Sequence, residues 1–552
     1  MLEVLKRYWG YDTFRPMQGE IITSLLEGRD TLAILPTGGG KSVCFQVPAL
    51  MREGICLVVS PLVSLMKDQV QNLAAKGIKA LTVHSGMTSR EIDITLDNAI
   101  YGDYKFLYVS PERLRSRLFL GRLEKMQVCL LVVDEAHCIS QWGYDFRPEY
   151  LEIAAVRDII GAGVPVAAMT ATATPRVAQD IMEKLRFARP NLLRTSFMRE
   201  NLKYTFRNVE DKMGNLLSYC RDTPGSGIVY VGRRRSAEDL TLFLRSQGIG
   251  AEGYHAGMER SRRDAVQDRW KRGETRIIVA TNAFGMGIDK PDVRFVCHYD
   301  MPGTLEGYFQ EAGRAGRDGK PSEALLLWNR NDVRRLRQIS AGEFPPLEYI
   351  RDIYQKVFIY LGIPYEEGGG TSRKFDVAEF ARHYALFPAT AYNAVRYIAQ
   401  SGYWTLTEEM QIPSRIRFKV SRDALYRIQL DDYSLDTFVK VLLRCYSGLF
   451  TEYVKIDEEK IARKGHYAVE VVKERLSELA RKGILTYVPA FTSPLLHFAN
   501  ERLTEDNLRL PEQEYRERLG RSRSHLEAMI SVVEAPAGEQ LRLMLAYFGE
   551  NI

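Results

Sequence analysis

Long apolar runs alternate with helix-patterned stretches along the first 340 residues of the chain. Strands that are buried on both faces read as continuous apolar runs, and such runs between helical stretches predict parallel sheets covered by helices. The runs that predict a first lobe are Thr31 to Leu35, LVVS from 57, FLYVS from 106, Val128 to Val133 and VPVAAMT from 164. After a turn-rich segment at 222–227, a second series comprises IVYV from 228, RIIVAT from 276, RFVCHY from 294 and EALLLW from 323. The pattern therefore predicts two α/β lobes that face each other across a cleft.

A different pattern follows residue 340. Helical patterning in Val377 to Tyr384 and Thr390 to Gln400, followed by the strand-like Tyr403 to Leu406, predicts a winged helix. A similar order recurs from Glu458 to Asn500, with Val469 to Lys482 as the strong helix and with ILTYVP and LLHFA as strands. This second segment is a candidate for another winged helix.

One strand in this region has a basic face. Arg415, Arg417 and Lys419 alternate with apolar residues, so a strand with a period of two would carry its three charges on one side. Such a face suits a wing that lies against a phosphate backbone. An ordinary solvated strand face explains the pattern equally well.

The segment PTGGGKS at 36–42 follows the first predicted strand directly and is typical of a phosphate-binding loop. Successive glycines let backbone N–H groups close around phosphate oxygens, Lys41 can neutralise the β and γ phosphates, and Ser42 can hold Mg²⁺. The strict pattern has Gly or Ala where Leu35 stands, and a flexible glycine loop is the alternative. The strand in front of the loop favours a nucleotide site.

Two adjacent acids, Asp134 and Glu135, follow the apolar run Val128 to Val133. Ligands of parallel α/β sheets bind at the carboxyl ends of strands, where Asp134 can hold Mg²⁺ and Glu135 can polarise the attacking water. Capping of the following helix is the alternative role. Because phosphoryl transfer needs mainly positioned charge around the γ-phosphate, the pair indicates nucleotide hydrolysis.

Two arginines three residues apart, Arg314 and Arg317, lie in the glycine-rich segment 310–319. They share one face if the segment is helical, and the glycines let a neighbouring domain approach closely. This arrangement suits arginine fingers, which stabilise the transferring phosphoryl group only when the cleft between two domains is closed. A surface loop rich in Arg and Gly is the alternative.

Seven motifs in this order resemble those of the RecQ helicases within superfamily 2. They are FRPMQ from 14, PTGGGKS from 36, SPLVSLMKDQV from 60, DEAHCISQWGYDFRPEY from 134, MTATATP from 169, ATNAFGMGIDKPDVRFV from 280 and QEAGRAGRDG from 310. The resemblance covers about residues 1 to 340 and is most specific in the aromatic-rich stretch from Asp134 to Tyr150. It implies two RecA-like lobes and an ATP-dependent DNA helicase that moves 3′ to 5′ on single strands, in DNA recombination and repair.

The resemblance also implies roles for single residues around the nucleotide. Tyr11 and Arg15 sandwich the adenine and Gln18 hydrogen-bonds its edge, whereas surface packing of Tyr11 and an ion pair of Arg15 are the alternatives. Asp289 helps to couple the second lobe to nucleotide and DNA. The implied phosphate-binding residues are Thr37, Gly38, Gly39, Gly40, Lys41 and Ser42.

The aromatic-rich loop is the implied contact with single-stranded DNA. Trp142 and Phe146 supply stacking and Arg147 supplies charge. Because Trp142 and Phe146 are four residues apart, core residues on one helix face are the alternative. His137 would link the Glu135 region to this loop, although an isolated histidine at a strand end is more often structural.

The composition is consistent with this resemblance but would not identify the family by itself. The 552 residues are 45% hydrophobic, which is enough for several packed domains, and the net charge of +6 permits nucleic-acid binding without requiring it. No apolar stretch approaches the roughly 20 residues of a membrane span, and the N-terminus lacks a signal-peptide core. Seven cysteines show no CxxC spacing, and several stand inside apolar strands. We expect a reduced, cytoplasmic protein, associated with the nucleoid if it is bacterial.

The C-terminal end departs from the family pattern. Many RecQ proteins carry a four-cysteine zinc module around the phrase YFGE, which stands here at 547–550. Glu539 occupies the approximate position of the upstream cysteine, and the chain stops at Ile552, so no thiolate set remains for tetrahedral zinc. Either the lineage lost the metal or the chain is truncated. The expected cofactors are ATP and Mg²⁺, without zinc.

The predicted fold class is α/β, with two RecA-like P-loop lobes followed by a mainly α C-terminal region that contains a winged helix. The predicted domains are lobe 1 at 1–205, lobe 2 at 206–340, a winged-helix-like DNA-binding region at 341–422, and a helical region at 423–552 with a second winged helix and the YFGE element. The expected partners are single-stranded and duplex DNA, with single-strand-binding or repair proteins, and no membrane. An RNA helicase is disfavoured because DEAH followed by the aromatic loop is not the DEAD-box pattern. An ATP-switched nucleic-acid binding or strand-annealing protein without processive unwinding remains the alternative.

Overall fold

The computed structural model describes residues 1–285, 290–412, 414–420, 425, 433–450, 452–489 and 491–550. These residues divide into two units. One unit holds Met1–Gln338 together with Gly520–Ile552, and the other holds Ile339–Leu519. The first unit contains both predicted lobes.

A seven-stranded parallel sheet forms the core of the first lobe, in the order β3-β4-β2-β5-β6-β1-β7. Its strands are β1 (Thr31–Ile34), β2 (Ile55–Val59), β3 (Ala80–Val83), β4 (Phe106–Val109), β5 (Val128–Val133), β6 (Val166–Thr170) and β7 (Leu192–Arg194). The five predicted strands are confirmed, and each is buried along its whole length. The apolar pattern does not predict β3 and β7, which lie at the two sheet edges and are partly exposed.

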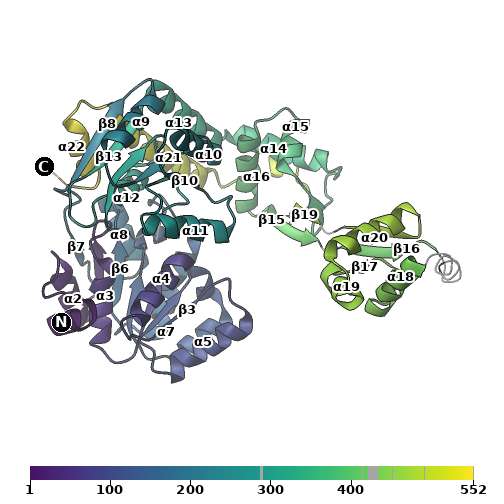
Figure 1. The fold of residues 1–552 in the computed structure, drawn as a ribbon, viewed down its shortest axis with the longest axis horizontal. Helices are drawn as coiled ribbons and strands as arrows, with labels where there is room; N and C mark the ends of the chain where they lie inside the picture. The colour runs from purple at the N-terminus through teal and green to yellow at the C-terminus, as the bar shows by residue number, and fades with distance from the viewer. Residues whose placement is uncertain are drawn as a thin grey trace. The chain divides into compact units, whose positions relative to one another are not determined.

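The helices of this lobe pack around the sheet (Figure 1). They are α1 (Leu2–Trp9), α2 (Gln18–Leu26), α3 (Lys41–Leu50), α4 (Val63–Ala74), α5 (Ser89–Tyr101), α6 (Arg117–Leu123), α7 (Ile153–Ile160) and α8 (Pro175–Lys184). Three short 3-10 helices, Pro111–Arg115, Ala136–Ile139 and Pro148–Glu152, connect them. Local sequence fixes some starts: at α5, Thr88 and Glu91 form a reciprocal capping box.

The second lobe has a six-stranded parallel sheet in the order β10-β11-β9-β12-β13-β8. Its strands are β8 (Leu202–Asn208), β9 (Ser226–Tyr230), β10 (Ala251–Tyr254), β11 (Ile277–Ala280), β12 (Val293–His298) and β13 (Ser322–Trp328). Its helices are α9 (Lys212–Asp222), α10 (Arg234–Ser246), α11 (Arg260–Lys271), α12 (Leu305–Ala312) and α13 (Arg330–Glu343). The four predicted strands are confirmed. Strand β8 spans the boundary predicted between residues 205 and 206, and its pairing with β13 makes it part of the second sheet.

In the second unit, a helix–helix–hairpin module is built from sequence-distant strands. It contains α14 (Leu347–Tyr360), β14 (Ser372–Lys374), α15 (Val377–His383), α16 (Pro388–Gln400), β15 (Trp404–Ile412) and β19 (Phe491–Phe498). Strand β19 pairs antiparallel with both β14 and β15. The helices predicted for the first winged helix are confirmed, but its last strand comes from near residue 495.

A second module of the same kind is inserted between β15 and β19. It contains β16 (Arg415–Phe418), α18 (Tyr433–Cys445), β17 (Val454–Lys455), α19 (Glu458–Gly465), α20 (Val469–Arg481) and β18 (Leu485–Val488). Figure 1 shows α18, α19 and α20 grouped around β16. One winged-helix-like module is thus nested within the hairpin of another.

The nesting corrects two sequence-based assignments. Strand β16 pairs with β17 and β18, so the basic strand belongs to the inserted module and not to the first winged helix, which was predicted to end at 422. The strands ILTYVP and LLHFA do not form one hairpin, because β18 pairs with β16 while β19 pairs with β15. The pattern of each strand identifies its apolar face but not its partner.

The chain ends in a helical hairpin. Its helices are α21 (Glu512–Glu534) and α22 (Glu539–Tyr547), and residues from Gly520 onwards belong to the unit that contains the two lobes. The predicted helical region 423–552 is therefore not one structural unit, because it spans the inserted module, β19 and this hairpin. No described helix is both long enough and apolar enough to cross a membrane.

Candidate functional site

The segment 36–42 forms a tight loop between β1 and α3. Gly38 and Gly40 have φ angles of +83° and +77°, in the left-handed region that glycine adopts without a steric penalty. Helix α3 begins at Lys41, so its N-terminal N–H groups face the loop. Leu35, at the position that departs from the strict pattern, is buried in the core.

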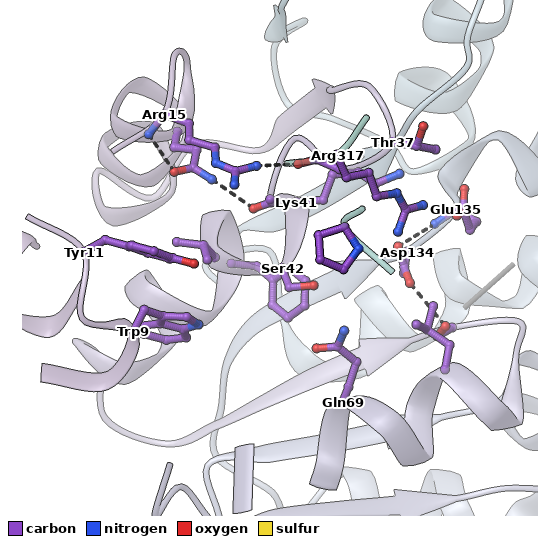
Figure 2. Close-up of a pocket in the computed structure, with 18 of the residues that line it drawn as sticks. Trp9, Tyr11, Arg15, Thr37, Lys41, Ser42, Gln69, Asp134, Glu135 and Arg317 are labelled. Atoms are coloured by element: carbon purple, nitrogen blue, oxygen red, sulfur yellow. Dashed lines mark hydrogen bonds between the residues drawn. The ribbon is translucent and has the colours of Figure 1, made fainter. Parts of the chain in front are cut away.

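A cavity of about 820 Å³ opens beside this loop (Figure 2). Residues of both lobes line it. The predicted site residues among them are Tyr11, Arg15, Gln18, Thr37, Gly38, Gly40, Lys41, Ser42, Asp134, Glu135, Arg314 and Arg317. Gly39 lies in the same loop, and Asp289 falls outside the described residues. The fold thus brings those predicted nucleotide residues that the structure describes to one place.

The two arginines of the second lobe reach this cavity without lying on a helix. Helix α12 ends at Ala312, so Arg314 and Arg317 follow it in turns, and the condition under which they would share a helical face is not met. Arg314 is nevertheless buried, and a Cβ on Gly38 would stand 2.8 Å from Cγ of Arg317. In Figure 2 Arg317 extends towards Asp134 and Glu135. The absence of a side chain at Gly38 therefore permits the close approach of the second lobe.

The opposite end of the cavity contains the residues expected to bind adenine. Tyr11 is 55% exposed, and Figure 2 shows it with Trp9 away from the carboxylates. Arg15 donates from Nη1 to the carbonyl of Gly38. The Gln18 amide donates to the carbonyls of Gly39 and Gly40, at 3.3 and 3.1 Å. Gln18 must therefore exchange a backbone partner in order to bond an adenine edge.

Asp134 and Glu135 lie at the end of β5. Ser60 donates to Oδ2 of Asp134 at 3.3 Å, and the Tyr150 hydroxyl donates to the Asp134 carbonyl at 2.9 Å. Burial and the neighbouring Glu135 charge raise the pKa of Asp134 to about 6. Burial alone would also raise the pKa of Glu135, but the positive charges of the nearby Lys41 and Arg314 hold it below its ordinary value. Glu135 makes no side-chain cap bond to the helix that follows, so the capping alternative is wrong.

His137 connects this carboxylate to the aromatic loop and to the second lobe. Its Nδ1 lies 2.9 Å from Oγ1 of Thr170 and 3.4 Å from Oε2 of Glu135. Its ring stacks on Tyr144 with centroids 4.9 Å apart, and the Tyr144 hydroxyl donates to Oε1 of Gln310 at 2.6 Å. Burial lowers the pKa of His137, so the ring is neutral near pH 7. A continuous path therefore runs from Glu135 to helix α12.

The aromatic-rich loop at 140–147 is irregular, so the helix-face alternative for Trp142 and Phe146 is wrong. Both side chains are half-buried. The guanidinium carbons of Arg176 and Arg521 lie 3.0 and 4.9 Å from the centre of the Trp142 ring. Arg147 forms an ion pair with Asp145 at 3.2 Å and donates to the Pro61 carbonyl. The three predicted DNA residues are close in sequence, but Arg147 is bound to other residues of its own lobe.

The basic strand lies in the other unit. Arg415, Arg417 and Lys419 are exposed while the alternating Ile416 and Phe418 are buried, as the period of two predicts. Lys455 of β17 stands directly opposite Arg415 and adds a fourth charge. This cross-strand neighbour was not predictable, because nothing in the sequence identifies β17 as the partner of β16.

Several further residues of the site were not among the predicted ones. They are Ser60, Gln69, Tyr144, Tyr150, Thr170, Arg176, Gln310 and Arg521. Six of these residues lie inside the quoted motifs, which is a usable signal: Ser60, Gln69, Tyr144, Tyr150, Thr170 and Gln310. Nothing in the local sequence around Arg521 signals its contact with Trp142.

The cavity fits a nucleoside triphosphate with Mg²⁺. Among the described residues, neither Oγ1 of Thr37 nor Oε2 of Glu135 has a hydrogen-bond partner, although both atoms are buried. A buried polar atom without a hydrogen bond destabilises the fold unless a ligand supplies the bond. Ser42 and Asp134 offer the hard oxygen ligands that Mg²⁺ prefers. Two α/β lobes with a phosphate loop on one and arginines from the other define a P-loop protein of the helicase type.

Comparison with known sequences agrees with this class. Residues 15–181 match the DEAD/DEAH box helicase family, residues 209–319 match the helicase conserved C-terminal domain, and residues 416–489 match the RecQ helicase winged-helix domain of Bacteroidota. The last match coincides with the inserted module.

Three of the similar proteins illustrate the extent of the match. The ATP-dependent DNA helicase RecQ of Pasteurella multocida is 43% identical over 61% of this chain and 54% of that protein. The probable ATP-dependent DNA helicase RecS of Bacillus subtilis is 42% identical over 64% of this chain and 71% of that protein. RecQ of Synechocystis is 42% identical over 61% of this chain and 73% of that protein. The chain belongs to the RecQ family of superfamily 2 helicases.

The extent of these similarities is partial. The chain spans only about half the length of the Pasteurella relative, 54%. Among solved structures, the DNA-bound helicase MrfA superposes with a TM-score of 0.51 at 17% identity, over 61% of this chain and 52% of that one. A likeness at that identity shows the two-lobed fold alone.

Proposed function

We propose that this chain is an ATP-dependent DNA helicase that moves 3′ to 5′ along a single strand, separates duplex DNA, and acts in DNA recombination and repair. The observation that carries the proposal is the shared cavity, in which Arg314 and Arg317 of one lobe meet the phosphate loop and Glu135 of the other. Arginines supplied across a cleft act only when the cleft is closed, which ties hydrolysis to motion between the lobes. The direction of movement rests on membership of the RecQ family.

Each residue has a chemical role in this proposal. Lys41 neutralises the β and γ phosphates, Ser42 and Asp134 hold Mg²⁺, and Glu135 polarises the attacking water. The low pKa of Glu135 keeps it ionised for that task. Arg314 and Arg317 stabilise charge on the transferring phosphoryl group. Tyr11, Arg15 and Gln18 select adenine, and Asp289 couples the second lobe to nucleotide and DNA.

Two surfaces contact DNA in this proposal. Single strands stack on Trp142 and Phe146, with charge from Arg147, and the path through His137 and Tyr144 carries the signal to the catalytic carboxylate. The exposed face of Arg415, Arg417, Lys419 and Lys455 contacts duplex phosphates. Arg415 and Lys455 lie directly opposite each other on neighbouring strands. Like charges in such a pair destabilise a sheet, and a bound polyanion would offset that cost.

The proposal is tested by strand separation on a forked DNA duplex with ATP, with a non-hydrolysable analogue, and without nucleotide. An ATP-driven helicase separates the strands only with hydrolysable ATP, and its ATPase rate rises with single-stranded DNA more than with RNA of the same sequence. An ATP-switched binding or annealing protein would instead change DNA affinity equally with ATP and with the analogue, and would leave the duplex intact. That outcome would refute the helicase proposal.

We also propose that this chain holds no structural zinc. The YFGE segment is fixed by other contacts: Phe548 stacks on Phe197 with centroids 4.6 Å apart, and Glu550 accepts from Ser196 Oγ at 2.8 Å and from the Phe197 amide at 2.7 Å. The last cysteine of the sequence is Cys445, far from this segment. Metal analysis of the purified chain should find no stoichiometric zinc, and EDTA followed by Mg²⁺ should leave its melting temperature and ATPase unchanged. One zinc per chain would contradict the proposal.

A further inference from the structure

The C-terminal hairpin, defined here as residues 520–550, contacts both lobes and the aromatic-rich loop. On the first lobe, Arg194 donates to the carbonyl of Gly549 at 3.2 Å, and Phe548 packs between Phe197 and Phe309, the latter from helix α12 of the second lobe. The Tyr547 hydroxyl donates to Oε1 of Glu306, also on α12, at 2.7 Å. The hairpin is therefore anchored to both lobes.

One residue of the hairpin lies over Trp142. The Arg521 guanidinium stands 4.9 Å from the centre of the indole, and Arg176 of α8 stands 3.0 Å from it. Trp142 also packs against the hydrophobic core of its lobe. A base that stacks on this indole therefore competes with a guanidinium for the ring. In the absence of DNA, the cation–π contact favours the arrangement in which Arg521 covers Trp142.

A second residue of the hairpin connects the same loop to α12. The backbone of Trp142 lies close enough to His525 to help raise the pKa of the imidazole, the His525 Nδ1 lies 3.2 Å from Oε1 of Glu306, and the same nitrogen lies 3.0 Å from the Tyr547 hydroxyl. Glu306 is 2% exposed, and its Oε2 has no hydrogen-bond partner among the described residues. A buried carboxylate in this position depends on His525 for compensation of its charge.

Helix α12 thus contacts the loop at two points one turn apart. Gln310 accepts from Tyr144 directly, and Glu306 is joined to Trp142 through His525. Two residues after α12 ends, the chain reaches Arg314 in the nucleotide cavity. A displacement of the loop is therefore transmitted to a rigid helix that leads directly into the arginines.

We propose that Arg521 and His525 are positioning residues for the DNA-sensing loop. Arg521 holds the indole of Trp142 until DNA replaces it, and His525 transmits the displacement of the loop to α12 and the arginines. This inference adds a coupling route to the proposed function. Its ATPase predictions rest on that function, because they require that DNA stimulates hydrolysis.

The two residues should affect different kinetic parameters. Because DNA must displace Arg521, Arg521→Gln should lower the DNA concentration that gives half-maximal ATPase stimulation by about three- to tenfold. His525→Ala should lower the maximal stimulated rate by about three- to tenfold while the half-saturating DNA concentration changes little. His525→Gln can still donate a hydrogen bond to Glu306 and should restore part of that rate. Loss of packing alone would not separate the two parameters in this way.

The experiment has two arms, each with Arg523→Gln as the matched control, since Arg523 is an exposed arginine on the same helix. The first arm measures ATPase rate against oligo-dT concentration for the wild type and the four variants. The second measures amide hydrogen exchange of residues 140–147 without DNA, where Arg521→Gln and His525→Ala should exchange faster than the control.

The arms separate failure of the inference from failure of the proposed function. A wild-type ATPase that oligo-dT does not stimulate would count against the proposed function, and the exchange arm would still decide the inference. Exchange in 140–147 that is equal in the control and in both variants would overturn the inference. Arg521→Gln with an unchanged or raised half-saturating DNA concentration would also overturn it.

Discussion

At the scale of single residues, the site depends on the balance of charge around two adjacent carboxylates. Asp134 and Glu135 are buried side by side, and Lys41 and Arg314 place positive charge near Glu135. Burial and the charge of Glu135 raise the pKa of Asp134, and a bound Mg²⁺ would favour the ionised form of this carboxylate. In the proposed function, the two carboxylates therefore have different tasks: Asp134 holds the metal and Glu135 acts on the attacking water.

Substitutions at Lys41 and Glu135 should separate binding from chemistry. Lys41→Ala and Glu135→Gln should each reduce DNA-stimulated ATP turnover by about 100-fold or more. Glu135→Gln keeps the shape of the side chain and should still bind ATP, whereas Lys41→Ala removes charge at the phosphates and should bind it weakly. Arg317→Ala should resemble Glu135→Gln. Turnover and fluorescent-nucleotide binding measure the two effects, with the exposed Glu124→Gln as control, and near-normal turnover in Glu135→Gln would show the role to be wrong.

The ion pair of His525 with Glu306 should make stability depend on pH. Burial opposes the charged imidazole, but Glu306 raises the pKa of His525 above 6.5, while His525 holds the pKa of Glu306 below 4.5. The contribution of His525 is therefore complete below pH 6.5 and disappears as pH rises through the raised value. Hydrogen bonds to charged groups contribute about 1.5–3 kcal/mol.

Thermal melting of the wild type and of His525→Gln at pH 6 and pH 8.5 tests this dependence. The difference in melting temperature between the two proteins should be larger at pH 6 than at pH 8.5. Arg523→Gln should melt like the wild type at both pH values. A difference that is equal at the two pH values, or larger at pH 8.5, would contradict the charged pair.

At the scale of elements, β16 and α12 each combine a face that is buried in a core with a face that is available for other contacts. Strand β16 buries Ile416 and Phe418 in the core of the inserted module and exposes its basic residues. Helix α12 packs Tyr308 and Phe309 inward and presents Glu306 and Gln310 to the loop and the C-terminal hairpin. In both elements the periodicity of the backbone determines which side chains are available for interaction.

Reversal of the charges on β16 should weaken duplex binding selectively. The triple substitution of Arg415, Arg417 and Lys419 by Glu should reduce duplex and junction affinity more than single-strand affinity. It should leave single-strand-stimulated ATPase largely intact, because these residues lie in a different unit from the nucleotide cavity. Binding to phosphates depends on salt, so the slope of log affinity against log salt should fall by about one unit for each phosphate that is no longer neutralised.

Fluorescence anisotropy with labelled duplex and single strands over a range of salt concentrations measures this effect. Lys440→Glu, a charge reversal at an exposed position of the same module, is the control. Unchanged duplex affinity and an unchanged salt slope in the triple variant would show that these residues form an ordinary solvated strand face.

At the scale of the whole molecule, the sequence predicts what is buried and locally patterned. The central strands of both lobes, such as β5, read as unbroken apolar runs because helices cover both their faces. Edge strands such as β7 and β8 are half-exposed, so they lack that signal, and the boundary between the lobes was placed inside β8. The phosphate-loop residues and the Asp134–Glu135 pair were predictable because each group lies in a short motif directly after a buried strand.

Contacts between sequence-distant segments were not predictable from the same patterns. The nested modules arise because β15 pairs with β19 across the whole inserted module, and a strand pattern does not reveal its partner. The contact of Arg521 with Trp142 joins residues separated by most of the chain, and the sequence around Arg521 does not differ from that of an ordinary surface helix. These long-range contacts are the ones that link the proposed DNA site to the nucleotide site.

The central claim, that hydrolysis drives movement 3′ to 5′ along one strand, is tested most directly by the unwinding of three duplexes of identical sequence. One has a 3′ single-stranded tail, one has a 5′ tail, and one has blunt ends, and each is incubated with ATP and Mg²⁺ in parallel with Glu135→Gln. The account predicts rapid separation of the 3′-tailed duplex by the wild type, little separation of the other two, and none by the variant. Equal separation of the 5′-tailed duplex, or no separation of any duplex despite DNA-stimulated hydrolysis, would contradict it.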